Sequence, residues 1–315
     1  MTLLAGDVGG TKTLLRLVGN DGSIVVDGRY DSAAYATFED LLREFLGPVP
    51  VAVDAACFAV AGPVYGARAE ITNVGWLIDE QTLMAAFPIG RVALINDFFA
   101  VALGVPLLRE PDLLSLHRGQ RDMAAPIGIL GAGTGLGEAF VVRVHGMYHV
   151  VPSEGGHGDF APQNEEQARL FLELHRQFGH VSWERVVSGM GLTSIYAFLG
   201  GGEIAPAEIA ERADAGDARA AHAFEIFVDA YGAEAGNMAL RLLARGGVYL
   251  AGGIAAKNVA RFTDGRFVEA YLRKGRFREL VATIPVDLIL NEEVGLIGAA
   301  EGARRALESP LRPAG

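Results

Sequence analysis

The chain has 315 residues, which predicts two domains at the usual ~150 residues each. Its 27 basic and 38 acidic residues give a formal net charge of −11, which disfavours non-specific binding to nucleic acid. The single cysteine, Cys57, excludes a disulfide scaffold and a cysteine-based zinc or iron–sulfur site, and it agrees with a reducing cytoplasm. The longest stretch without a charge, 186–202, is too short for a membrane-spanning helix, and the first residues lack the pattern of a signal peptide.

The first predicted element is a strand that ends in a glycine-rich turn. Leu3–Ala5 is apolar and leads into Gly6-Asp7-Val8-Gly9-Gly10-Thr11, after which Thr13–Val18 predicts a second strand. Asn20-Asp21-Gly22 predicts a hairpin turn before a further strand at Ser23–Val26. A glycine turn after a strand lets backbone N–H groups approach phosphate oxygens.

Asp7 lies inside this glycine-rich turn. A carboxylate beside phosphate-binding amides would repel an anion unless a cation lay between them. Mg²⁺ bridging through water would resolve that conflict. The alternative is an aspartate that caps its own turn.

The next informative strand ends in two polar residues. A helix is predicted at Phe38–Leu46, and Val92–Ile95 predicts a buried strand that leads into Asn96-Asp97 and a helix at Phe98–Val105. Ligands bind at the carboxyl ends of strands in α/β sheets. Asp97 is therefore a candidate general base that accepts the proton of an attacking hydroxyl, and the alternative is a helix N-cap. Asn96 beside it suits hydrogen bonding to a polyol.

The pattern of strand, glycine turn and strand occurs a second time. Its segments are Ile127–Leu130, the turn Gly131–Gly137 with Thr134, Glu138–Val144, the turn His145-Gly146, and Met147–Val151. Two copies suit two structurally related domains, with a boundary near 106–111. Neither glycine turn fits the Rossmann fingerprint or the P-loop. We therefore favour a pair of phosphate-binding β-hairpins, facing each other across a cleft, over two ordinary tight turns.

Polar side chains gather in a glycine-rich loop after the second hairpin. Glu154, His157 and Asp159 lie in a segment too rich in glycine for a regular helix. Glutamate accepts hydrogen bonds from two hydroxyls and histidine both donates and accepts, so a polyhydroxyl ligand is favoured over a metal ion. Further along, Glu184 has no capping explanation; it is either a further ligand or a solvated charge at a helix start.

The rest of the chain alternates helices with a short buried strand. Helical periodicity covers Glu165–Phe178, Pro206–Ala213, Ala218–Leu243 and Leu296–Leu307, and a strand is predicted at Val248–Ala251 before Gly252-Gly253. Strands alternating with helices predict an α/β fold.

Taken together, these motifs resemble the bacterial glucokinase family, in the group without a zinc motif, within the superfamily of actin, sugar kinases and heat-shock ATPases. The matching segments are Gly6–Thr11, Ile71-Thr72-Asn73 with Trp76, Ile95–Phe98, Gly131–Gly137, Glu154–His157, Glu184–Val186 with Ser188-Gly189, Ala251–Ile254 and Gly295-Leu296. They run in family order along nearly the whole chain. The single cysteine excludes the zinc-bearing relatives.

The resemblance implies transfer of the ATP γ-phosphoryl group to the 6-hydroxyl of glucose, with Asp97 as the catalytic base. The implied sugar ligands are Asn73, Asn96, Glu154, His157 and Glu184. The implied phosphate-binding residues are Gly6, Asp7, Val8, Gly9, Gly10, Thr11, Gly133, Thr134 and Gly135, with Asp7 holding Mg²⁺ directly or through water. Gly252 and Gly253 are implied to form part of the adenosine pocket.

The resemblance also implies an architecture and a setting. It implies two actin-like (ribonuclease H-like) α/β domains with a cleft between them. The small domain comprises 1–108 plus 296–315, and the large domain comprises 109–295. The implied protein is a cytoplasmic homodimer of glycolysis, with glucose and ATP as its ligands and no nucleic-acid or membrane partner.

Several alternatives stay open on the sequence. The substrate could be another hexose, such as mannose, fructose or glucosamine, and the donor could be ADP or polyphosphate. A non-catalytic sugar sensor on the same fold is disfavoured by the intact Asp97. A chaperone-like or actin-like ATPase would have no use for Glu154, His157 and Glu184. Lys12 follows Thr11 where close relatives often carry asparagine, and it either touches phosphate or faces solvent.

Overall fold

The computed structural model describes residues 1–19, 21–47 and 52–308. The chain divides into two compact units: Met1–Leu108 together with the segment from Glu293 onward, and Arg109–Glu292. Asn20 of the predicted hairpin turn, and 309–315 of the predicted small domain, lie outside the described residues.

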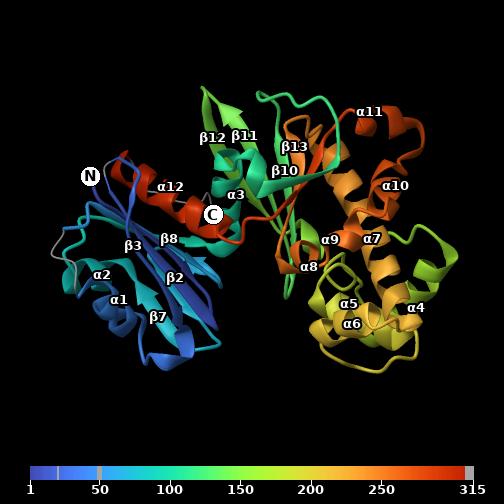
Figure 1. Cartoon of the computed structure of the whole chain (residues 1–315), viewed down its shortest axis with the longest axis horizontal. Helices are drawn as coiled ribbons and strands as arrows, with labels where there is room; N and C mark the ends of the chain where they lie inside the picture. Colours follow the sequence, from blue (N-terminus) through green and yellow to red (C-terminus); the bar gives the residue numbers. More distant parts are fainter. Residues whose placement is uncertain (20, 48–51, 309–315) are drawn as a thin grey trace. The chain divides into compact units, whose positions relative to one another are not determined.

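The first unit is built on a five-stranded sheet in the order β3-β2-β1-β4-β8 (Figure 1). The strands are β1 Leu3–Val8, β2 Lys12–Val18, β3 Ile24–Asp31, β4 Ala55–Val60 and β8 Val92–Asn96. The central strand β1 pairs antiparallel with β2 and parallel with β4. All six residues of β4 are buried, as expected for a central strand covered on both faces.

Helices cover the two faces of this sheet. On one face, α1 (Phe38–Leu46) packs its apolar stripe, which includes Phe38 and Phe45, against Leu4 and Phe58 of the strands. On the other face lie α3 (Asp97–Gly104) and α12 (Val294–Glu308). The unit is completed by α2 (Glu80–Ala86) and a three-stranded sheet of β5 (Val64–Tyr65), β6 (Arg68–Ile71) and β7 (Trp76–Asp79).

Glycines bring α3 and α12 into close backbone contact. A Cβ on Gly298 would lie 1.7 Å from the carbonyl oxygen of Ala100, and one on Gly104 would lie 2.3 Å from that of Val294. A side chain at either position would force the two helices apart. The last described helix is thereby held in the first unit, far in sequence from the strands it covers.

The second unit contains a six-stranded sheet in the order β12-β11-β10-β13-β14-β9. The strands are β9 Leu113–His117, β10 Ile127–Ala132, β11 Leu136–Val144, β12 Met147–Ser153, β13 Gly247–Ala251 and β14 Val286–Ile289. Its helices are α4 Glu165–Phe178, α5 Gly189–Phe198, α6 Pro206–Asp214, α7 Ala218–Leu242, α8 Gly253–Lys257, α9 Val259–Phe262, α10 Arg266–Leu272 and α11 Arg278–Ala282. The middle of α7 is buried in a core that it shares with β10 and β13.

The two units repeat one arrangement at their centres. Strand β10 pairs antiparallel with β11 and parallel with β13, as β1 does with β2 and β4. The predicted duplication of strand, glycine turn and strand is therefore confirmed. The predicted turn between β11 and β12 is confirmed as well: His145 and Gly146 have φ of 50° and 84°, the left-handed pair of a type I′ hairpin.

The predicted helices agree closely with those observed. Phe38–Leu46 and Glu165–Phe178 have the predicted bounds, while the helix predicted at Phe98–Val105 begins one residue earlier, at Asp97. Within the described parts of the chain, no helix is both long and apolar enough to pass through a bilayer.

Candidate active site

The first glycine hairpin, Gly6–Thr11, joins β1 to β2 in the first unit. Gly9 closes the turn by donating its N–H to the carbonyl oxygen of Lys12 at 3.0 Å. Gly10 lies against Asn73, because a Cβ at position 10 would be 2.7 Å from the Cβ of Asn73. Gly6 and Val8 are buried in β1, while Thr11 is exposed at the tip of the hairpin.

Hydroxyl groups that the sequence did not single out support this hairpin. Ser32 Oγ donates to the carbonyl oxygen of Gly9 at 2.7 Å and lies 2.9 Å from Thr13 Oγ1. Both side chains belong to buried residues, and buried hydroxyls need such partners. Ser32 directly follows a strand of mainly exposed residues, so only the folded chain reveals that it is buried.

Asp7 and Asp97 are like charges close together in the first unit. Burial, with the Asp97 carboxylate as the second cause, raises the pKa of Asp7 to about 6, while the Lys12 ammonium acts in the opposite direction. Lys12, half-buried, thus acts on Asp7. Asp7 Oδ2 lies 3.3 Å from where a Cβ on Gly295 would be. A divalent cation would offset the charge that two such carboxylates concentrate.

Asn96, not Asp97, is the N-cap of α3. Asn96 Oδ1 accepts from the backbone N–H groups of Phe98 and Phe99 at 3.0 and 3.2 Å. The interpretation of Asp97 as an ordinary N-cap is therefore wrong, because the preceding asparagine takes that role. Asn96 Nδ2 donates to the carbonyl oxygen of Gly62 at 3.4 Å.

Asp97 is the first residue of α3 and is partly buried. Its Oδ1 accepts from the N–H of Phe98 at 2.8 Å. Burial raises the pKa of Asp97, against the lowering effect of its hydrogen bonds with Phe98 and Asn96. A carboxylate with a raised pKa at the carboxyl end of a strand is suited to accept a proton.

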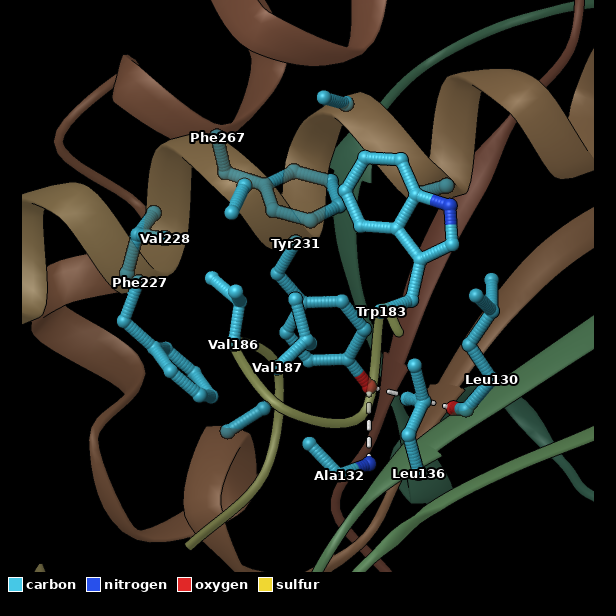
Figure 2. Close-up of a cluster of buried hydrophobic side chains, with 14 of the residues drawn as sticks. Leu130, Ala132, Leu136, Trp183, Val186, Val187, Phe227, Val228, Tyr231 and Phe267 are labelled. Atoms are coloured by element: carbon cyan, nitrogen blue, oxygen red, sulfur yellow. Dashed lines mark hydrogen bonds between the residues drawn. The ribbon is translucent and has the colours of Figure 1, made fainter. Parts of the chain in front are cut away.

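The second glycine hairpin, Gly131–Gly137, joins β10 to β11 in the second unit. Gly133 donates its N–H to the carbonyl oxygen of Gly135 at 2.8 Å, and Thr134 is exposed at the tip. The buried Tyr231 of α7 fixes the start of the hairpin (Figure 2). Its hydroxyl accepts from the N–H of Ala132 at 3.2 Å and donates to the carbonyl oxygen of Leu130 at 3.3 Å.

The structure brings three of the predicted sugar ligands together. His157 Nε2 lies 3.7 Å from Glu154 Oε2, and His157 Nδ1 lies 3.8 Å from Glu184 Oε1. The Glu154 side chain is 91% exposed and that of Glu184 only 22%. Glu184 lies in a turn well before α5 and is half-buried, so its interpretation as a solvated charge at a helix start is wrong. Asp159 lies apart from them, in an exposed hydrogen bond with His180.

Gly252 and Gly253 lie where β13 ends and α8 begins. Gly252 has a φ of 89°, and a Cβ there would lie 2.4 Å from the carbonyl oxygen of Ala132, so this position needs glycine. The loop after β13 therefore runs directly against the second hairpin. Within 1–19, 21–47 and 52–308, no group of three or more His, Cys, Asp or Glu side chains is arranged to hold a metal ion.

A buried acidic pair lies behind the sugar-ligand loop and was not predicted. Glu138 of β11 and Glu234 of α7 have side chains with no exposed area. Burial, with Glu234 as the second cause, raises the pKa of Glu138 to about 8, while Arg241 opposes the shift. A Cβ on Gly155 would lie 2.1 Å from Glu138 Oε2. Strand alternation, which places Glu138 on the same face as the buried Leu136, is the signal that could have found it.

Comparison with known proteins agrees with this arrangement. The family model for Glucokinase matches residues 4–306. A curated glucokinase of Nostoc sp. (strain PCC 7120) is 42% identical, over 96% of this chain and 99% of the relative. The crystal structure of a glucokinase from an Antarctic psychrotroph aligns with a TM-score of 0.88 at 31% identity, covering 96% of this chain and 99% of that one.

More distant structures share the fold. The glucokinase from Balamuthia mandrillaris, solved in complex with glucose, has a TM-score of 0.78 at 22% identity, covering 96% of this chain and 93% of that one. The predicted fold class, α/β units of the actin-like type, is confirmed by these likenesses. The predicted enzyme class is confirmed too: this chain belongs to the glucokinase family of kinases.

Proposed function

We propose that this enzyme transfers the γ-phosphoryl group of ATP to the 6-hydroxyl of glucose, with Asp97 as the general base. The observation that carries this proposal is the placement of Asp97. It lies at the carboxyl end of β8, partly buried, with its neighbour Asn96 rather than itself capping α3. The carboxylate is thus left to orient a hydroxyl and to accept its proton as the hydroxyl attacks phosphorus.

Glu154, His157 and Glu184 are proposed to bind the sugar. Their convergence in the second unit supports this, because an imidazole with a carboxylate within 4 Å of each ring nitrogen offers several hydrogen bonds to a polyol. Asn73 and Asn96, in the first unit, are proposed to contribute further hydrogen bonds. A site that hydrogen-bonds hydroxyls rejects analogues that lack them, because its polar groups are then left unpaired.

The two glycine hairpins are proposed to bind the phosphates of ATP through backbone N–H groups. The residues are Gly6, Asp7, Val8, Gly9, Gly10 and Thr11 in the first hairpin and Gly133, Thr134 and Gly135 in the second. Gly252 and Gly253 are proposed to form part of the adenosine pocket, which the glycine-dependent backbone at Gly252 supports.

Asp7 is proposed to hold Mg²⁺, directly or through water. The donor set fits, because a hard cation prefers carboxylate oxygen, and Asp7 lies near a second carboxylate in a partly buried place. When bound, the ion would neutralise phosphate charge. The protein itself would hold Asp7 and Asp97 in place and keep both carboxylates ionised. The Lys12 ammonium favours the ionised form of Asp7.

We also propose a cytoplasmic homodimer that acts in glycolysis, with the two units as its small and large domains. The single cysteine, which is buried and free, suits a reducing compartment.

A coupled assay of phosphorylation tests the substrate assignment. Glucose, mannose, fructose and glucosamine are each offered with ATP, ADP or polyphosphate. We expect glucose with ATP to give the highest kcat/KM. No turnover of glucose with any donor would overturn the proposal, and a higher kcat/KM for another hexose would reassign the substrate.

A further inference from the structure

Glu184 joins the second glycine hairpin to the loop that carries Glu154 and His157. Its Oε2 accepts the backbone N–H of Leu136 at 2.9 Å. Its own backbone N–H donates to the carbonyl oxygen of Gly156 at 2.9 Å. One residue therefore contacts the proposed phosphate-binding segment through its side chain and the proposed sugar-binding segment through its backbone.

The hairpin is shaped around this carboxylate. A Cβ on Gly135 would lie 2.4 Å from Glu184 Oε2, far inside van der Waals contact. A Cβ on Gly133, two residues earlier in the same turn, would meet nothing within 4 Å. Neither glycine has a φ in the left-handed region. Glycine at 135 is therefore required by the carboxylate and not by the backbone conformation.

Further contacts hold the segment around Glu184 against the hairpin. Gly189 donates its N–H to the carbonyl oxygen of Gly133 at 2.8 Å, and Ser188 Oγ donates to that of Glu184 at 2.6 Å. Trp183 and Val186, on either side of Glu184, are buried in the same core as Leu136 of the hairpin (Figure 2). The carboxylate has little freedom to move away from the Leu136 N–H.

The two oxygens of Glu184 consequently have separate tasks. Oε2 is committed to the hairpin, while Oε1 faces His157 Nδ1 at 3.8 Å. We propose that Glu184 is a positioning residue for the phosphate-binding hairpin as well as a sugar ligand, so that Gly135, on the nucleotide side, determines the affinity for sugar. This inference rests on the proposed function of the two segments.

A reciprocal effect follows from thermodynamic linkage. If the hairpin sets the place of the Glu184 carboxylate, the carboxylate also sets the place of the hairpin N–H groups. A change that displaces the hairpin or the carboxylate must therefore alter binding at the other site.

Calorimetric titration of glucose without nucleotide tests the first half. Gly135→Ala should raise the Kd for glucose about ten-fold, the scale of losing a well-placed charged hydrogen-bond acceptor. The matched variant Gly133→Ala should stay within about two-fold of wild type, since its methyl group meets open space. Equal glucose affinity in Gly135→Ala and wild type would overturn the inference, as would equal losses in both variants. Circular dichroism checks that each variant is folded.

Titration of ADP without sugar tests the reciprocal half. Glu184→Gln retains an oxygen that can accept the Leu136 N–H, so its Kd for ADP should stay near that of wild type. Glu184→Ala removes the acceptor and should weaken ADP binding by about five-fold or more. Unchanged ADP affinity in Glu184→Ala would contradict the positioning role.

Wild-type binding separates this inference from the proposed function. If the wild-type protein binds neither glucose nor ADP, the proposed function itself fails. If wild type binds both while Gly135→Ala and Glu184→Ala behave as wild type, only the coupling through Glu184 is wrong.

Discussion

The two glycine hairpins occupy equivalent places in their sheets, yet different chemistry surrounds them. The first lies near Asp7, Asp97 and Lys12, and a small hydroxyl, Ser32, supports it. The second is anchored by Tyr231 from the core and bonded to Glu184. The repeated backbone arrangement thus carries the proposed general base in one unit and three of the proposed sugar ligands in the other. A duplicated topology sets where ligands approach, and the side chains around each turn set what is done there.

Replacement of Asp97 gives the largest expected effect and tests whether the first unit carries the chemistry. Asp97→Asn keeps the size but cannot accept the proton, so kcat should fall by about 10²–10⁴-fold. Glucose affinity, measured by titration, should change little, because three of the proposed sugar ligands are in the second unit. A near-normal kcat would remove Asp97 from its role as base.

Glu138 offers a pH test of the second unit. Its folded pKa of about 8 lies above the unfolded value near 4.5, so the folded state binds more protons between these values. Stability should therefore fall as pH rises through this window and then level off. Glu138→Gln should flatten the fall and stabilise the protein at pH 9 by a few kcal/mol, since one pKa unit equals ~1.4 kcal/mol.

The first unit should respond to pH over a lower range. The pKa of Asp7 is raised to about 6, so the stability that the protein loses as Asp7 ionises is almost all lost below neutral pH. Above that range, urea unfolding of wild type and of Glu138→Gln between pH 6 and pH 9 measures how much of the fall in unfolding free energy is due to Glu138. Parallel pH profiles for the two proteins would show that Glu138 is already ionised at neutral pH.

Gly10 and Gly133 test how tightly each hairpin is packed. Gly10→Ala places a Cβ 2.7 Å from the Cβ of Asn73, so it should cost about 1–3 kcal/mol of unfolding free energy. Gly133→Ala meets nothing within 4 Å and should cost less than about 1 kcal/mol. Thermal unfolding distinguishes the two, and equal losses would mean that the hairpins are packed alike.

Removal of single hydroxyls gives the smallest expected effects. Tyr231→Phe removes the group that accepts from Ala132, and Ser32→Ala removes the group that donates to Gly9. Each should cost about 1 kcal/mol of stability, the net worth of a typical buried hydrogen bond. Denaturant titration measures both; a loss for only one of them would show that one hairpin does not depend on its support.

Much of the local structure can be predicted from short segments of sequence. Apolar periodicity marked α1 and α4, and glycine clusters marked both hairpins and the turn at His145-Gly146. These features depend on contacts between residues a few positions apart, which sequence spacing records directly. The order of the motifs, likewise a property of the sequence, indicated the glucokinase family that the comparisons confirmed.

Only the tertiary structure decided which side chains share an environment. The bond between Leu136 and Glu184 spans 48 positions, and Glu138 meets Glu234 from another element of the fold. Even for the adjacent Asn96 and Asp97, only the structure decided that Asn96 caps α3, so that the alternative of Asp97 as the N-cap was wrong. By itself the sequence determined several of the helices and strands, the glycine turns and the family, because these follow from local spacing and motif order. The partners, burial and pKa of each acid were decided by packing, because they depend on how distant segments meet.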